Sequence, residues 1–327
     1  MMHHIFMTRE MTLTPQMAKD AAARLGLDGA VELLASERDL TWRLVSGGRA
    51  FVLKICHAEE APWVVEFQLG ALRHLAARAP ALPVPRVLAH ARLGYEDGGE
   101  RETYVLSWLD GALLSHHRDG AAQAAAMGAM MARMCLALED LPPPPAPPAQ
   151  LWDVARALQI RPMLAGIEPG PARLAGAVLD EFEARVMPRL GTLPRQVIHN
   201  DCNPHNVFVD PADPARITGI IDFGDLTVAP RMCDLAVGLS YQMQTPELRA
   251  TIPAWLAAYG AVAPLSAGER AVLAGLIRTR MAMTVVISSW RAARAPENAA
   301  YLLRYRAGAM ACLEAGEGIF EGMFGDE

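Results

Sequence analysis

Three polar residues near the middle of the chain have the types and spacing that metal binding and hydroxyl chemistry require. Asp201 and Asn206 lie in 199-HNDCNPHNVF-208, and Asp222 ends the apolar run in 219-GIIDFGD-225. Hard divalent cations such as Mg²⁺ take oxygen ligands and often share them with phosphates. A carboxylate and a neutral amide can hold such a cation, while a second carboxylate deprotonates an attacking hydroxyl. The alternative interpretation is a polar turn between two strands.

The spacing of these residues matches a known pair of motifs. The segment from His199 to Asn206 fits H-x-D-x-x-x-x-N, and residues 221–224 read I-D-F-G, as in the catalytic and metal-binding loops of protein kinases. The first motif alone would leave the polar turn as a competing explanation. The second motif, at the end of an apolar strand, favours the functional interpretation.

A lysine in a strand-like segment fits the same chemistry. The chain has 28 arginines but only two lysines, and Lys54 lies within the apolar run FVLKI. Kinases place such a lysine on the third strand, where it contacts nucleotide phosphates and pairs with a glutamate of the next helix. Glu66 is the favoured partner because it lies inside the predicted helix, whereas Glu59 and Glu60 precede it. The alternative is an edge-strand lysine whose ammonium lies in solvent.

The segment that would cover the phosphates has no glycine-rich motif. In its place, 35-ASERDLTWRL-44 connects the first two predicted strands. The hydroxyls of Ser36 and Thr41, together with backbone amides, can lie over phosphates, and an ordinary hairpin turn explains the segment equally well.

The pattern along the chain predicts an α+β protein with a small β-rich lobe, residues 1–107, and a larger helical lobe, residues 108–327. Period-two and period-3.6 apolar patterns separate the two element types. The expected strands are 31–35, 40–45, 50–56 and 103–109. The expected helices are 63–78, 119–139, 172–190, 268–294 and 298–315, and a strand–loop–strand unit carries the three polar residues.

The composition limits the classes of partner. The net charge is −6 and 52% of the residues are apolar, so nothing indicates a nucleic-acid partner. No apolar run is expected to reach the length that a membrane span needs. Five scattered cysteines without paired spacing predict a reduced, cytoplasmic protein without a structural zinc site. Oligomeric state is not predicted.

The motifs resemble those of the aminoglycoside phosphotransferase and choline-kinase-like superfamily, with closest similarity to its hydroxylysine-kinase-like branch. The resemblance covers most of the chain and implies a bilobal, protein-kinase-like fold that uses ATP and Mg²⁺. Its most specific parts are VIHNDCNPHNVFVD at 197–210 and ITGIIDFGDL at 217–226, with softer matches at 36–44, 51–55, 233–236 and 278–291.

The resemblance implies a role for each matched position. It makes Asp201 the catalytic base, Asn206 and Asp222 the Mg²⁺ ligands, and Asp234 a structural aspartate behind the catalytic loop. It also makes Lys54 and Glu66 the phosphate-binding pair, and Ser107 to Leu109 the hinge that binds adenine. The family usually has glycine where Asn200 stands, so the turn before Asp201 is expected to differ.

The acceptor is expected to be a small molecule. Only nine residues separate Gly224 from Asp234, and no A-P-E motif follows, so a peptide platform is not expected. The predicted function is therefore ATP-dependent phosphorylation of a hydroxyl on an amino alcohol or hydroxylated amino acid. The alternatives are an aminoglycoside resistance enzyme, a nucleotide-binding pseudokinase, and a metallohydrolase built on four residues of the same segment: His199, Asp201, His205 and Asp222.

Arg280 is the candidate for acceptor recognition. It lies on an apolar stripe of the helix 278-RTRMAMTVVISSWR-291, where an arginine requires an anionic partner. One hypothesis gives it the carboxylate of an amino acid acceptor, held through two parallel hydrogen bonds. The alternative is a protein carboxylate such as Asp234.

Overall fold

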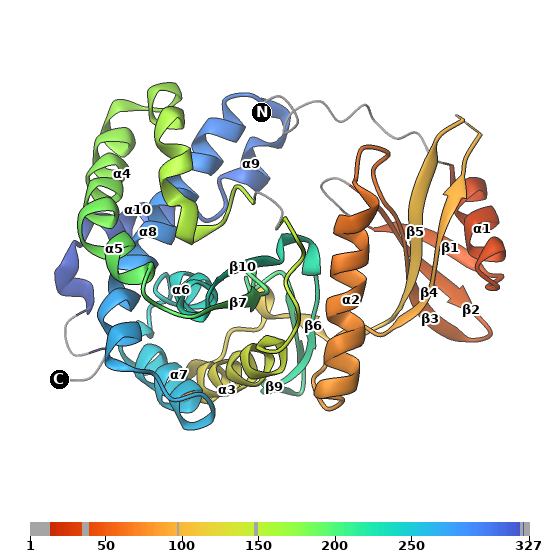
Figure 1. The fold of residues 1–327 in the computed structure, drawn as a ribbon, viewed down its shortest axis with the longest axis horizontal. Coiled ribbons are helices and arrows are strands. Elements are labelled where there is room, and N and C mark those ends of the chain that lie inside the picture. The colour runs from red at the N-terminus through yellow and green to blue at the C-terminus, as the bar shows by residue number, and fades with distance from the viewer. Residues whose placement is uncertain (1–13, 35–38, 97, 147–149, 321–322, 324–327) are drawn as a thin grey trace. The chain divides into compact units, whose positions relative to one another are not determined.

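The structure of the chain is a computed structural model that describes residues 14–34, 39–96, 98–146, 150–320 and 323. The chain divides into two compact units. Unit 1 comprises residues 1–77 and 83–110, and unit 2 comprises residues 78–82 and 111–327. Unit 1 is built on an antiparallel sheet and unit 2 is mainly helical, which confirms the α+β class (Figure 1).

Unit 1 is a five-stranded antiparallel sheet with the strand order β1-β2-β3-β5-β4. Its elements are α1 (Pro15–Arg24), β1 (Ala30–Leu34), β2 (Leu40–Ser46), β3 (Arg49–Ile55), α2 (Pro62–Arg78), β4 (Val87–Gly94) and β5 (Glu100–Ser107). Gly47 and Gly48 have φ of 56° and 75°, as a tight hairpin between β2 and β3 requires. The hairpin fixes the register of β3 and therefore the face on which Lys54 lies.

The two faces of β3 have different environments. Leu53 and Ile55 are fully buried and belong to the apolar core of unit 1, which α1 supplies with three alanines. Because successive side chains of a strand point to opposite faces, Lys54 points away from this core. Helices α1 and α2 lie on opposite sides of the sheet (Figure 1), so Lys54 lies on the α2 side.

Unit 2 consists of short strands surrounded by helices. Its strands are β6 (Ala112–Leu113), β7 (Arg195–Ile198), β8 (Val207–Asp210), β9 (Asp213–Ile220) and β10 (Thr227–Pro230). Its α-helices are α3 (Gly120–Leu138), α4 (Pro169–Glu181), α5 (Met187–Leu190), α6 (Arg231–Gln242), α7 (Leu248–Val262), α8 (Ala267–Ala292), α9 (Ala299–Leu302) and α10 (Arg306–Glu314). Shorter turns are η2 (Leu114–His116), η3 (Val154–Gly166), η4 (Phe182–Val186), η5 (Phe223–Asp225), η6 (Pro296–Asn298) and η7 (Glu317–Phe320).

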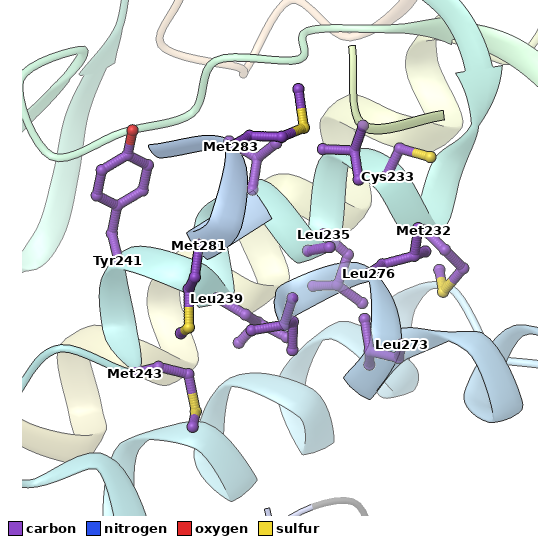
Figure 2. Close-up of a cluster of buried hydrophobic side chains, with 14 of the residues drawn as sticks. Met232, Cys233, Leu235, Leu239, Tyr241, Met243, Leu273, Leu276, Met281 and Met283 are labelled. Carbon is purple, nitrogen blue, oxygen red and sulfur yellow. The ribbon is translucent and has the colours of Figure 1, made fainter. Parts of the chain in front are cut away.

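Helix α6 forms the centre of unit 2. Every residue from Met232 to Tyr241 is buried, and α8 packs along it. Figure 2 shows the methionine and leucine side chains of the two helices in contact, with Tyr241 at the edge of the cluster and its ring directed away from Leu239 and Met243. Pairing of β7 with β10 and of β8 with β9 anchors the polar segments 199–206 and 221–226 beside this core.

Three features differ from the expected elements. Strand β4 was not among the expected strands. The helix expected over 298–315 is interrupted after Leu302 by a turn, and α10 begins at Arg306. The helix expected over 172–190 contains a π-helical turn, η4.

Two helices contradict the expectation that no apolar segment is long enough to span a membrane. Helices α3 and α8 are long and apolar enough to cross a bilayer by length and composition alone. Most of each apolar window is buried inside the protein, 61% for α3 and 78% for α8, as in core helices of globular domains.

Candidate active site

The catalytic loop connects β7 to β8 and holds Asp201 through two asparagines. Asp201 Oδ2 accepts hydrogen bonds from the Asn206 amide at 2.8 Å and from the Asn203 amide at 2.9 Å. Asn206 also donates to the Asp201 carbonyl at 3.0 Å. Because the Asn206 nitrogen is occupied by Asp201, its oxygen is the atom left for a cation. Asn203 was not assigned a role from the sequence.

Asn200 takes the backbone conformation that glycine usually supplies. Its φ is 67°, in the left-handed region that asparagine tolerates better than most residues. Its N–H donates to Asp234 Oδ1 at 2.7 Å, and Asp234 is only 3% exposed. Asp234 therefore lies where the structural aspartate was expected.

His199 joins the catalytic loop to the segment that carries Asp222. Its Nδ1 accepts the N–H of Asp201 at 3.2 Å, so its Nε2 is the protonated atom and donates to the Ile221 carbonyl at 3.1 Å. The Ile221 N–H also donates to the Asn206 carbonyl at 2.9 Å. These bonds place Asp222 beside the catalytic loop.

Asp222 and its neighbour Asp225 concentrate negative charge next to Asp201. Asp222 is exposed, has φ of 64°, and accepts the Gly224 N–H. Burial, followed by the charges of Asp201 and Asp222, raises the pKa of Asp225 to about 7. A divalent cation would relieve this repulsion. The Asp222 carboxylate and the Asn206 oxygen therefore suit a hard cation that takes its remaining ligands from phosphates and water. Asp225 was not singled out from the sequence.

Asp201 has an environment that suits a general base. Burial raises its pKa to about 6; Arg280 and the two asparagines oppose this effect, and the charge of Asp222 adds to it. A carboxyl group with this pKa is mainly ionised at neutral pH and still takes up a proton readily, as general-base catalysis requires.

Arg280 has protein partners in the interior of unit 2. Its side chain is 1% exposed, Nη2 lies 3.5 Å from Asp201 Oδ1, and Nη1 donates to the Trp152 carbonyl at 2.9 Å. The guanidinium also lies 4.6 Å from the centroid of the Trp152 ring. The structure thus gives Arg280 a protein carboxylate as its partner, as the alternative hypothesis held, but the carboxylate is that of Asp201 and not that of Asp234.

The segment before η3 contacts both parts of the site. Trp152 contacts Arg280, while Gln150 donates to the Gly224 carbonyl at 3.1 Å. Gln159 donates to the carbonyls of Gln150 and Leu151 and so fixes the segment. These contacts were not predicted from the sequence, because long-range contacts leave no local periodic pattern.

In unit 1, Lys54 pairs with a carboxylate that the sequence analysis did not consider. Lys54 Nζ lies 3.0 Å from Asp39 Oδ2, and Asp39 Oδ1 accepts the His57 N–H. The Glu66 carboxylate lies 3.3 Å from His90 Nδ1 and 3.4 Å from Arg73 Nη1. Asp39 is thus the partner that the structure shows for Lys54, and the pairing with Glu66 stays a prediction.

The other nucleotide-binding candidates also lie in unit 1. Thr41 is directly opposite Lys54 in the β2–β3 pairing, whereas Ser36 is outside the described residues. The N–H of Ser107 donates to the Arg86 carbonyl and its Oγ accepts the Arg86 N–H, so the Ser107 amide is occupied. Adenine binding by the hinge from Ser107 to Leu109 stays a prediction, and it requires backbone groups other than the Ser107 N–H.

The phosphotransferase enzyme family model, APH, matches residues 30–276. This match covers both polar segments and most of the chain, so the chain belongs to the phosphotransferase enzyme family.

Curated relatives are named as small-molecule kinases. Homoserine kinase of Acidiphilium cryptum is 32% identical over 241 residues, which are 70% of this chain and 70% of that one. Hydroxylysine kinase of Danio rerio is 29% identical over 134 residues. That match covers 40% of this chain and only 38% of the relative's length.

Solved structures share the fold. Amicoumacin kinase hAmiN, in complex with AMP-PNP and Ca²⁺, has a TM-score of 0.69 at 16% identity and covers 93% of this chain and 94% of its own. At this identity the similarity concerns the fold, and it confirms the expected kinase-like architecture.

The metallohydrolase alternative has no matching ligand set. Among the residues that the structure describes, no group of three or more His, Cys, Asp or Glu side chains is arranged to hold a metal ion. His199 uses both ring nitrogens in the loop bonds described above, which gives it a structural role.

Proposed function

We propose that this protein is an ATP-dependent kinase that phosphorylates the hydroxyl of a small hydroxylated amino acid or amino alcohol. The observation that carries this proposal is the environment of Asp201. A carboxylate with a pKa of about 6 is held by two asparagine amides beside Asp222, which is the arrangement a hydroxyl acceptor requires.

Each residue has a separate task in the proposed reaction. Asp201 orients the acceptor hydroxyl and takes its proton as the bond to phosphorus forms. Asn203 and Asn206 keep the carboxylate oriented, and Arg280 supports it from the interior. Lys54, fixed by Asp39, contacts nucleotide phosphates.

Asn206 and Asp222 are the proposed ligands of Mg²⁺. When bound, the cation would neutralise charge that develops on the nucleotide phosphates. The proposed protein ligands are one carboxylate oxygen and one amide oxygen. Mg²⁺ sites that also bind substrate phosphates typically have few protein ligands, all of them oxygens.

The substrate class rests on the relatives. Homoserine and hydroxylysine are both amino acids that carry a hydroxyl. We place the reaction in the cytoplasm, which is consistent with five buried cysteines that are all free thiols.

The proposal is tested with purified protein, ATP and Mg²⁺ against hydroxy amino acids, amino alcohols, choline and aminoglycosides. The expected result is acceptor-dependent ADP release together with a phosphomonoester on the acceptor. Nucleotide binding without transfer to any of these acceptors would favour the pseudokinase alternative instead.

A further inference from the structure

With Arg280 occupied by Asp201, an acceptor carboxylate requires another cation near the catalytic loop. A group of four basic side chains includes His205 of that loop. We call it the cationic cluster; its members are His116, Arg118, His205 and Arg304.

Aromatic rings connect the cluster to α6. The ring of His205 contacts Tyr305 edge-on, with centroids 5.7 Å apart, and Tyr305 contacts Tyr241 in the same way at 4.8 Å. Arg304 lies over Tyr305 at 5.2 Å, and Arg118 Nη1 donates to the Tyr241 carbonyl at 3.2 Å. Arg304 and Tyr305 occupy the turn that interrupts the helix expected over 298–315.

The arginines of the cluster differ from other arginines of unit 2 in their partners within the described part of the chain. Other arginines of unit 2, including Arg161, Arg278 and Arg306, have carboxylates within 2.6 Å of a guanidinium nitrogen. For Arg118 and Arg304, no carboxylate of the described residues lies within ion-pair distance; each donates to a backbone carbonyl. Burial and then the charges of Arg304, His116 and Arg118 lower the pKa of His205. Among the described residues, no carboxylate therefore offsets the charges of Arg118 and Arg304.

The cluster is close to the reacting groups. His205 precedes the proposed metal ligand Asn206 in the same loop. Arg118 and Tyr241 line a recess together with Cys202 and Pro204, which flank the loop residue Asn203. Burial raises the pKa of Tyr241, and the charges of Arg280 and Asp201 also act on its hydroxyl. A ligand held by the cluster would therefore lie next to the loop that carries Asp201.

We propose that Arg118 and Arg304 bind the carboxylate of the acceptor and so select hydroxylated amino acids over amines that lack this group. The inference rests on the proposed kinase function and names the substrate class of the same site. Two guanidinium groups present planar sets of donors that match a carboxylate. A polycationic aminoglycoside would instead be repelled by them, so the cluster disfavours that alternative acceptor.

The test compares acceptors that differ only in the negative charge. 5-Hydroxylysine and homoserine are each assayed beside their carboxamides, which keep the size and the hydroxyl. The wild type should prefer each acid. Arg118→Met and Arg304→Met should each lower kcat/KM for the acids by about 10- to 100-fold and leave the amides and the KM for ATP nearly unchanged.

Arg294→Met is the matched control. Arg294 lies 3.6 Å from the centroid of the Trp290 ring and donates to the Trp290 carbonyl, as Arg304 does with the ring and carbonyl of Tyr301. Arg294→Met should change kcat/KM neither for the acids nor for the amides. Thermal unfolding of each variant shows whether it folds as the wild type does.

Binding measurements separate this inference from the proposed function. Calorimetry with AMP-PNP present measures affinity for acid and amide without turnover. Preferential binding of the acid that Arg304→Met abolishes supports the subsite, even if no phosphate is transferred and the proposed function fails. Equal binding and turnover of acid and amide by the wild type overturns the subsite while the kinase assignment stands. The subsite is also overturned if the wild type binds neither acid, or if Arg304→Met weakens the binding of acid and amide equally.

Discussion

Arg280 is the largest fully buried side chain in the part of the chain that the structure describes, and its charge lies against Asp201. A buried cation is tolerated when it is paired and hydrogen-bonded, and here the partners are a carboxylate, a carbonyl and an indole ring. Arg280 therefore orients Asp201 from behind and does not need to contact substrate.

Substitution of Arg280 should affect turnover more than nucleotide binding. Arg280→Met removes the support of Asp201, so kcat should fall by about tenfold or more while the KM for ATP changes little. Arg280→Lys keeps the charge and should retain part of the activity. Steady-state kinetics with saturating acceptor measures both parameters.

Arg161→Met serves as the comparison, because Arg161 of η3 is also paired with carboxylates, Asp180 of α4 and Glu183 of η4, but at the protein surface. It should keep the wild-type kcat. An unchanged kcat in Arg280→Met would remove the positioning role.

A second residue-level prediction concerns the partner of Lys54. Asp39 lies 3.0 Å from the ammonium and is itself fixed by the His57 N–H, whereas the Glu66 side chain is 56% exposed. Asp39→Asn should raise the KM for ATP by about tenfold, because it loses a charge-assisted contact. Glu66→Gln should change it little. The opposite ranking in ATP titrations would restore Glu66 as the partner.

At the level of elements, an ion pair fastens the start of α6 to the start of α8. Arg231 donates to both oxygens of Glu269 at 2.5 Å and 2.9 Å, and Glu269 also accepts from Ser266 in a capping box. Burial alone would raise the pKa of Glu269, but the bonds from Arg231 and Ser266 outweigh it and lower the pKa. The pair holds together the two helices that carry Asp234 and Arg280.

Removing this pair should make stability less dependent on pH. A lowered folded-state pKa contributes stability above the unfolded-state value, and this contribution disappears as pH falls through the folded-state value. Glu269→Gln should therefore lower the free energy of unfolding by about 1–3 kcal/mol at neutral pH.

Urea unfolding at several pH values measures this difference, which should shrink below about pH 4 as wild-type Glu269 takes up its proton. A difference that stays constant from neutral to acidic pH would contradict the assigned ion pair.

The elements also show what the sequence could predict. The β2–β3 hairpin, α2 and the long helices α3 and α8 follow from turn residues and local apolar periodicity, and the structure has them near the expected positions. The turn at 303–305 and the contact of Trp152 with Arg280 were not predicted. Both depend on packing between segments far apart in the chain, which local pattern does not encode.

For the whole molecule, family and reaction class could be predicted because the reacting groups are close in sequence. Asp201, Asn206 and Asp222 lie close together along the chain, so their spacing in the sequence already indicates that their side chains can meet. The groups that tune them, Arg280 and Asp225, become visible only in the folded chain, as does the grouping of the basic side chains in the cationic cluster. Acceptor specificity depends on such groups and therefore could not be predicted from the sequence.

The proposed function depends on phosphoryl transfer to a hydroxyl with Asp201 as the base. The most direct measurement is ³¹P NMR of ATP, Mg²⁺ and 5-hydroxylysine with the wild type and with Asp201→Asn, alongside nucleotide affinity. We expect a phosphomonoester on the acceptor hydroxyl with the wild type. Asp201→Asn should bind ATP normally and form this product about 10²- to 10⁴-fold more slowly. Product formation at the wild-type rate by Asp201→Asn would contradict the account.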